Sequence, residues 1–114
     1  SERVGFVGEH ARAAQVIEMV LDTGATSDMF GTAAPTRATL TERREPAPAK
    51  QLVHTAEEGK HLRVPAEGVL RARPVDDSVP RDNLTASIVM ASALEVEGMD
   101  VNLKSVAKWC DAQD

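Results

Sequence analysis

The sequence predicts an all-β domain that ends in a single helix. Short apolar runs rich in β-branched residues alternate with turns that contain Gly, Pro, Asp or Asn, as strands and their connections do. Two of these runs flank a polar segment with one glycine, which is typical of a β-hairpin. Only the last segment has an apolar repeat close to the helical period. The 114 residues suffice for one domain, 1–114, and not for two.

The first predicted element is a strand over residues 15–21. This run, QVIEMVL, is dense in β-branched side chains and leads directly into a turn with a glycine. The longer segment 9–21 is rich in Ala and lacks Gly and Pro, so propensity alone also allows a helix there. We prefer the strand, and we expect residues 1–14 to be an N-terminal extension.

The middle of the chain predicts a loop followed by several strands. Residues 31–50 contain three prolines among many Ala, Thr and charged residues, and we expect them to form a loop excursion. Residues 51–55 and 61–64 then form the predicted hairpin. Further strands are expected over 68–75 and 84–96, separated by a turn with two prolines.

The C-terminal segment predicts a helix over residues 101–112. Its apolar residues recur at close to 3.6-residue intervals, and they are Val101, Leu103, Val106, Ala107 and Cys110. Asp100 stands where a helix N-cap is expected. On this apolar stripe Cys110 is expected to be a buried small hydrophobe and not a nucleophile.

Composition argues against several classes of partner. The net charge is −5, aromatic residues make up 3% of the chain and tyrosine is absent, so neither a basic face nor stacking platforms for nucleic acid are expected. No apolar run approaches the roughly 20 residues that span a bilayer, so no membrane partner is expected. A single cysteine and no leader favour an intracellular location. Because the chain starts at Ser1, we expect it to be part of a longer protein.

An Asp-Thr-Gly triplet, Asp22 to Gly24, follows the first predicted strand. Acid proteases use two carboxylates that face each other and share one proton, so that one activates water and the other protonates the substrate carbonyl. Thr23 offers a hydroxyl to a partner turn, and Gly24 offers an N–H to the carboxylate. Taken alone, the triplet is equally consistent with an ordinary turn.

Three segments, in order, resemble copia-type LTR retrotransposon proteases, a group of retropepsins. VLDTGATSDM at 20–29 resembles their active-site segment, an aliphatic pair followed by D-[ST]-G-A-[ST], a small polar residue and His-Met. HTAEEGKHLRVPAEGV at 54–69 resembles their hairpin, and VEGMDVNLKSVAKWC at 96–110 resembles V-P-G-L-x-x-N-L-L-S-V-x-K-L-C. The resemblance covers about residues 16–112, with little over 31–50.

The resemblance implies a retropepsin-like barrel with one C-terminal helix, forming one half of a twofold homodimer. Asp22 would be the catalytic aspartate, with Thr23 and Gly24 completing the active-site turn. Because the chain has one Asp-Thr-Gly, two subunits would each supply one aspartate. The flap over the substrate would be the hairpin around 55–60 or the return strand near 65–68. The substrate-binding residues it suggests are Ala25, Asp28, Glu58 and Gly59.

The implied function is aspartic endopeptidase activity that processes a retrotransposon Gag-Pol polyprotein. The partners would be a second copy and peptide segments of the same polyprotein, without metal or organic cofactor, in the cytoplasm within retrotransposon particles. No metal site is predicted, because His10, His54 and His61 show no ligand spacing with each other or with Cys110.

The sequence departs from the family pattern in five places. Asp28 replaces a usual His, so this acid would either contact substrate or be solvated. Glu97 and Lys104 replace a Pro and a Leu, which puts charges into segments that normally pack. The hairpin is poorer in glycine than usual. The chain ends just after the helix, so the dimer would be held by other elements, or its terminal clamp lies partly outside this chain.

Two alternatives follow from the same residues. The first is a small intracellular interaction or dimerisation domain without catalysis, in which residues 9–21 form a helix and DTGATS is its C-terminal turn. The second is a retropepsin fold that has lost activity and serves only as a dimerising module.

Overall fold

The structure is a computed structural model that describes residues 2–8, 16–32, 40–54, 59–75 and 87–113. Its elements are β1 (Arg3–Gly8), β2 (Val16–Asp22), β3 (Met29–Gly31), β4 (Thr41–Arg44), η1 (Pro48–Lys50), β5 (Leu52–His54), β6 (His61–Arg63), β7 (Ala66–Val75), β8 (Ile88–Val96), β9 (Asn102–Ser105) and α2 (Val106–Gln113). This content confirms the prediction of a mostly β domain with a C-terminal helix.

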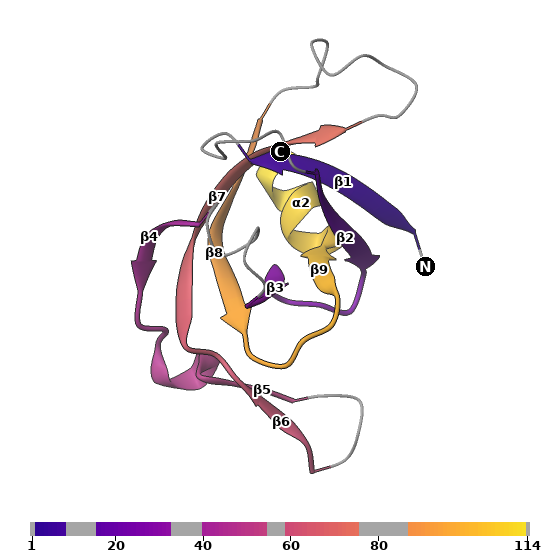
Figure 1. Ribbon diagram of the computed structural model, residues 1–114. Coiled ribbons are helices and arrows are strands. Elements are labelled where there is room, and N and C mark those ends of the chain that lie inside the picture. Colours follow the sequence, from indigo (N-terminus) through magenta and orange to yellow (C-terminus); the bar gives the residue numbers. More distant parts are fainter. Residues whose placement is uncertain (1, 9–15, 33–39, 55–58, 76–86, 114) are drawn as a thin grey trace.

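Six of the strands close into a barrel. The strand order is β1-β2-β9-β3-β8-β7, and β1 also pairs with β7, so the sheet returns on itself. β4 extends the sheet along the free part of β7. Helix α2 lies across one end of this barrel, and the β5–β6 hairpin projects from the other end (Figure 1). The barrel therefore separates the helix from the hairpin.

The barrel contains two parallel strand pairs among antiparallel ones. β2 runs parallel to β9, with Asp22 opposite Ser105, and β3 runs parallel to β8. Residues 16–22 and 102–105 are distant in sequence, so these pairings bring the turn after β2 beside the start of α2. The predicted active-site turn is therefore anchored by the C-terminal segment.

The main core fills the barrel interior with few aromatic side chains. In β2, Ile17 and Met19 are buried while Glu18 between them is exposed, the alternation expected of a strand with one face inward. The buried cluster comprises Phe6, Ile17, Met19, Phe30, Leu40, Leu70, Ala72, Met90 and Ala93. Trp109 of α2 packs against Phe6 with ring centroids 5.5 Å apart, which docks the helix onto the barrel.

The hairpin forms a separate two-stranded sheet. β5 and β6 pair antiparallel over three residue pairs, from Leu52 with Arg63 to His54 with His61. This confirms the predicted hairpin. Its apolar side chains Val53 and Leu62 pack against a second cluster of Val64, Leu94 and Val96 at the edge of the barrel.

Two predictions for the N-terminal half were wrong. Residues 3–8 are not an extension but strand β1, which pairs with β2 and β7 and buries Phe6 in the core. The loop predicted over 31–50 contains β4 and η1 among its described residues. The polar β4 is held by ion pairs rather than by apolar burial: Arg43 contacts the buried Glu95 at 2.7 Å, and Arg44 contacts Glu67 at 3.1 Å.

The helix prediction was wrong in its first turn. Residues 102–105 are strand β9, and α2 begins at Val106. Ser105, not Asp100, caps the helix, because its Oγ accepts a hydrogen bond from the Lys108 N–H at 3.2 Å. Strand pairing with β2 and β3 overrides the helical periodicity here. Cys110 is exposed, which also contradicts its predicted burial.

In the part of the chain that the structure describes, no helix is long and apolar enough to cross a membrane.

A glycine at the barrel edge supplies a first testable prediction. A Cβ on Gly31 would lie 2.5 Å from the Met99 carbonyl oxygen, which belongs to the backbone and cannot rotate away. We expect Gly31→Ala to lower the free energy of unfolding by about 1 to 3 kcal/mol, measured by urea denaturation.

Gly5 provides the matched control. A Cβ there would also meet an atom at 2.5 Å, but that atom is Cγ1 of Val16, the end of a side chain that is 43% exposed and free to shift. Gly5→Ala should change the free energy of unfolding by about 0.5 kcal/mol or less. Equal effects of the two substitutions would contradict the predicted steric cause.

Candidate active site

The Asp-Thr-Gly turn follows directly from the end of β2. Asp22 is the last residue of the strand and is half-buried, whereas Thr23 and Gly24 are exposed. The Gly24 N–H donates to Asp22 Oδ1 at 2.8 Å. A Cβ on Gly24 would lie 3.4 Å from this same oxygen, an ordinary van der Waals distance, so the bond itself does not require a glycine. The carboxylate is thus oriented by its own turn.

The side chain of Ser105 anchors the turn. Its Oγ donates to the Ala25 carbonyl at 2.7 Å and accepts from the Lys108 N–H at 3.2 Å. One hydroxyl therefore joins the turn to the first turn of α2. Because Ser105 is fully buried and lies opposite Asp22 in the β2–β9 pairing, the position of Asp22 depends on the C-terminal segment.

A cleft of about 430 Å³ opens beside Asp22. The turn supplies Asp22, Gly24, Ala25 and Thr26, the hairpin supplies Val53, His54 and Leu62, and Met29, Met99 and Leu103 complete the lining. Asp22 is the single carboxylate among these lining residues. The cleft is otherwise mainly apolar, as ligand-binding clefts usually are.

The structure brings some predicted site residues together and not others. Asp22, Gly24 and Ala25 share the cleft, and Thr23 lies in the same turn. Gly59 is exposed at the hairpin with φ of 81°, a conformation that favours glycine. Glu58 lies outside the described residues. Of the two predicted flap segments, 55–60 lies mostly outside the described residues, and the hairpin residues that line the cleft flank it: Val53, His54 and Leu62. Residues 66–68 of the other segment form part of the barrel strand β7.

Asp28 is neither solvated nor part of the cleft, contrary to both expectations for it. Its side chain is 3% exposed and its Oδ1 accepts hydrogen bonds from Lys104 Nζ at 2.8 Å and from the Ser105 N–H at 2.9 Å. Lys104 is equally buried, and its ammonium also donates to the Ser105 carbonyl. A buried carboxylate requires such a partner, so the two charges compensate each other.

Three departures from the retropepsin pattern therefore have partners in the structure. Asp28 and Lys104 neutralise each other beneath the active-site turn. Glu97 ties the end of β8 to the hairpin, because its carboxylate contacts Arg63 at 3.0 Å and its N–H donates to the Arg63 carbonyl at 2.9 Å.

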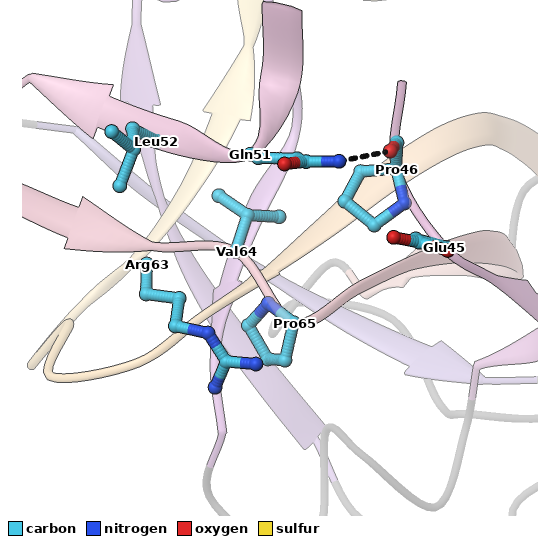
Figure 2. Close-up of a pocket in the computed structure, with 7 residues that line it drawn as sticks. All are labelled: Glu45, Pro46, Gln51, Leu52, Arg63, Val64 and Pro65. Atoms are coloured by element: carbon cyan, nitrogen blue, oxygen red, sulfur yellow. Dashed lines mark hydrogen bonds between the residues drawn. The ribbon is translucent and has the colours of Figure 1, made fainter. Parts of the chain in front are cut away.

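A second hollow of about 340 Å³ lies at the base of the hairpin (Figure 2). Its lining consists of Glu45, Pro46, Gln51, Leu52, Arg63, Val64 and Pro65. Gln51 Nε2 donates to the Pro46 carbonyl at 3.2 Å, and the Arg63 guanidinium contacts Glu97. The Gln51 bond ties the start of the hairpin to the β4–η1 segment, and the Arg63 contact ties the hairpin to the end of β8. No predicted site residue is among those that line it.

Sequence reasoning missed Ser105 and the proximity of His54 to His61. Ser105 was assigned to a helix interior, although a serine before an apolar helical run is a recognisable N-cap signal. The two histidines flank the predicted hairpin at positions that its register makes direct neighbours. Their ring centroids are 4.3 Å apart.

Comparison of the chain with models of known families, with curated proteins and with solved structures finds no match in any of the three.

The buried ion pair gives a second prediction. Lys104→Met leaves the Asp28 carboxylate buried without its cation and should lower the free energy of unfolding by about 3 to 5 kcal/mol. Asp28→Asn combined with Lys104→Met removes both charges, and the Asn oxygen can still accept from the Ser105 N–H. This double variant should recover most of the loss in urea denaturation.

The exposed pair of Arg3 with Glu18 is the control. Its 2.6 Å distance is shorter than that of the buried pair, but both side chains are more than half exposed. Arg3→Met should therefore change the free energy of unfolding by less than about 1 kcal/mol. If Lys104→Met were as mild as Arg3→Met, burial of the Asp28 charge could not be the cause.

Proposed function

We propose that this chain is one subunit of a retropepsin-like aspartic endopeptidase, in which Asp22 from each of two copies forms the catalytic pair. The observation that carries this proposal is the position of the Asp22 carboxylate. It lines a mainly apolar cleft to which the β5–β6 hairpin contributes Val53, His54 and Leu62, and the N–H of Gly24 orients it. The Asp-Thr-Gly resemblance and this geometry point to the same residue.

The cleft of one chain holds half of the required chemistry. Acid proteolysis needs one carboxylate that accepts a proton from water and a second that donates one to the peptide carbonyl. Asp22 is the lone carboxylate among the described lining residues, and Asp28 is committed to Lys104. A twofold homodimer supplies the second group with no other change, because each copy brings the same turn.

In the proposed reaction, the ionised Asp22 takes a proton from water, and the water oxygen attacks the carbonyl carbon of the peptide. The protonated Asp22 of the second copy gives its proton to the carbonyl oxygen. The tetrahedral intermediate then breaks its C–N bond as the nitrogen accepts the proton now held by the first Asp22. The carboxylate of the second copy takes a proton back from a hydroxyl of the intermediate, which leaves a carboxylic acid and an amine and restores the pair with one proton. The Gly24 N–H keeps the carboxylate in place during these transfers, and the hairpin excludes bulk water.

The cleft suits an extended peptide with apolar side chains. Its apolar lining residues come from the hairpin, from β3 and from the segment before β9, and they are Val53, Leu62, Met29, Met99 and Leu103. An extended peptide can also form backbone hydrogen bonds with a neighbouring strand. Following the resemblance to copia-type proteases, we propose that the substrate is the polyprotein to which the chain belongs.

One of the two non-catalytic alternatives conflicts with the structure. The interaction-domain hypothesis requires a helix that continues to Leu21, but residues 16–22 form strand β2. A retropepsin-like module without activity differs from the present proposal only in catalysis, so a cleavage assay separates the two.

The third prediction concerns Asp22. Asp22→Asn should reduce cleavage of peptides from the polyprotein junctions at least about 100-fold at pH 4 to 6, because an amide cannot accept the proton of water. Asp100→Asn, at an exposed position outside the cleft lining, should leave the rate unchanged. Pepstatin should inhibit the wild type. Full activity of the Asp22→Asn variant would end the protease hypothesis.

The fourth prediction tests the shared site. Specific activity should rise with protein concentration, because the active species is a dimer. An excess of folded Asp22→Asn chain added to wild type should suppress activity through mixed dimers, whereas an excess of Asp100→Asn should not. Activity independent of concentration, with no suppression, would contradict a catalytic pair formed by two copies.

A further inference from the structure

We propose that His54 and His61 form a binding site for a borderline-soft divalent cation such as Zn²⁺ on the β5–β6 hairpin. The two residues are directly opposite in the antiparallel register, so the hairpin itself holds their side chains on one face. The inference does not depend on protease activity, and its test uses none.

The two imidazole rings lie in contact with each other. The imidazole centroids are 4.3 Å apart, and the ring planes meet at 78°. Tetrahedral zinc binds imidazole nitrogen at about 2.0 to 2.1 Å, which places two ligating nitrogens about 3.3 Å apart. To bind one cation, the two side chains would turn so that one nitrogen of each ring faces it. Both histidines are exposed, so a cation has direct access.

The chemistry of the pair selects the class of metal. Imidazole suits zinc, copper and nickel, whereas magnesium and calcium prefer oxygen ligands. Among the described residues, no group of three or more His, Cys, Asp or Glu side chains is positioned to hold a metal. The site therefore offers two protein ligands, and water completes the coordination.

Binding would have a consequence for the hairpin. The sheet of β5 and β6 has three residue pairs, and such short two-stranded sheets are marginally stable alone. A cation that bridges His54 and His61 links both strands at the end of the hairpin remote from the barrel. Because it binds only the paired arrangement, it stabilises that pairing.

The experiment is a calorimetric titration of the untagged chain with ZnCl2, NiCl2 and MgCl2. We expect one Zn²⁺ or Ni²⁺ per chain and no binding of Mg²⁺. His54→Asn and His61→Asn should each weaken Zn²⁺ binding at least about tenfold, because each removes one arm of a chelate. Hydrogen exchange of the amides in β5 and β6 should slow with Zn²⁺ in the wild type and not in either variant.

His10→Asn and Cys110→Ser are the controls, since they remove the remaining histidine and the exposed thiol. Both should bind Zn²⁺ as the wild type does. The proposal is overturned if His54→Asn and His61→Asn bind as tightly as wild type, or if the controls abolish binding. One metal per two chains would assign the cation to a contact between copies and would also overturn it.

Discussion

The buried ion pair of Asp28 with Lys104 is the interaction on which the candidate site depends. Asp28 lies just after the Asp-Thr-Gly turn, and Lys104 lies in β9, so the pair joins two segments that are far apart in the sequence. The same carboxylate also accepts the Ser105 N–H, and the Lys104 ammonium lies 5.7 Å from the centre of the Trp109 ring. Trp109 in turn packs on Phe6 in the barrel. This ion pair thereby links the turn, β9, α2 and the core. Loss of either partner would leave the other charge buried without compensation.

This linkage holds the turn that lines the cleft, which we call the floor, and the β5–β6 hairpin, which also lines it, is called the cover. The floor combines the parallel pairing of Asp22 with Ser105, the hydrogen bond from Ser105 to Ala25, and the helix cap. The cover is a two-stranded sheet attached to the barrel by a small apolar cluster and by the contacts of Arg63 with Glu97. Fewer buried contacts mean a lower free energy of local opening, so the hairpin is the part able to move while Asp22 stays fixed.

The elements that the sequence predicted are those defined by neighbours in the chain. β2 and the hairpin follow from local β-branched runs and a turn, and both are confirmed. Residues 102–105, which form β9, were predicted as helix from the local spacing of apolar residues. That spacing carries no information on pairing with β2, which lies some 80 residues away. The ion pair of Asp28 with Lys104 could not be predicted for the same reason. Each buried charge is unfavourable without its partner, and only the barrel topology brings the two side chains together. β4 was missed because charge pairing, not apolar alternation, holds it.

Asp22 and Asp28 illustrate how environment divides the roles of two carboxylates six residues apart. Asp28 is enclosed with a cation and a backbone N–H, so its charge is satisfied within the fold. Asp22 receives a neutral backbone N–H on Oδ1 and lies half-buried in a cleft, where its charge remains available to a ligand or a second chain. A carboxylate needs the first environment to support a structure and the second to transfer a proton. The position that departs from the retropepsin pattern is enclosed in an ion pair, and the Asp-Thr-Gly position, which is proposed above to be catalytic, lines the cleft.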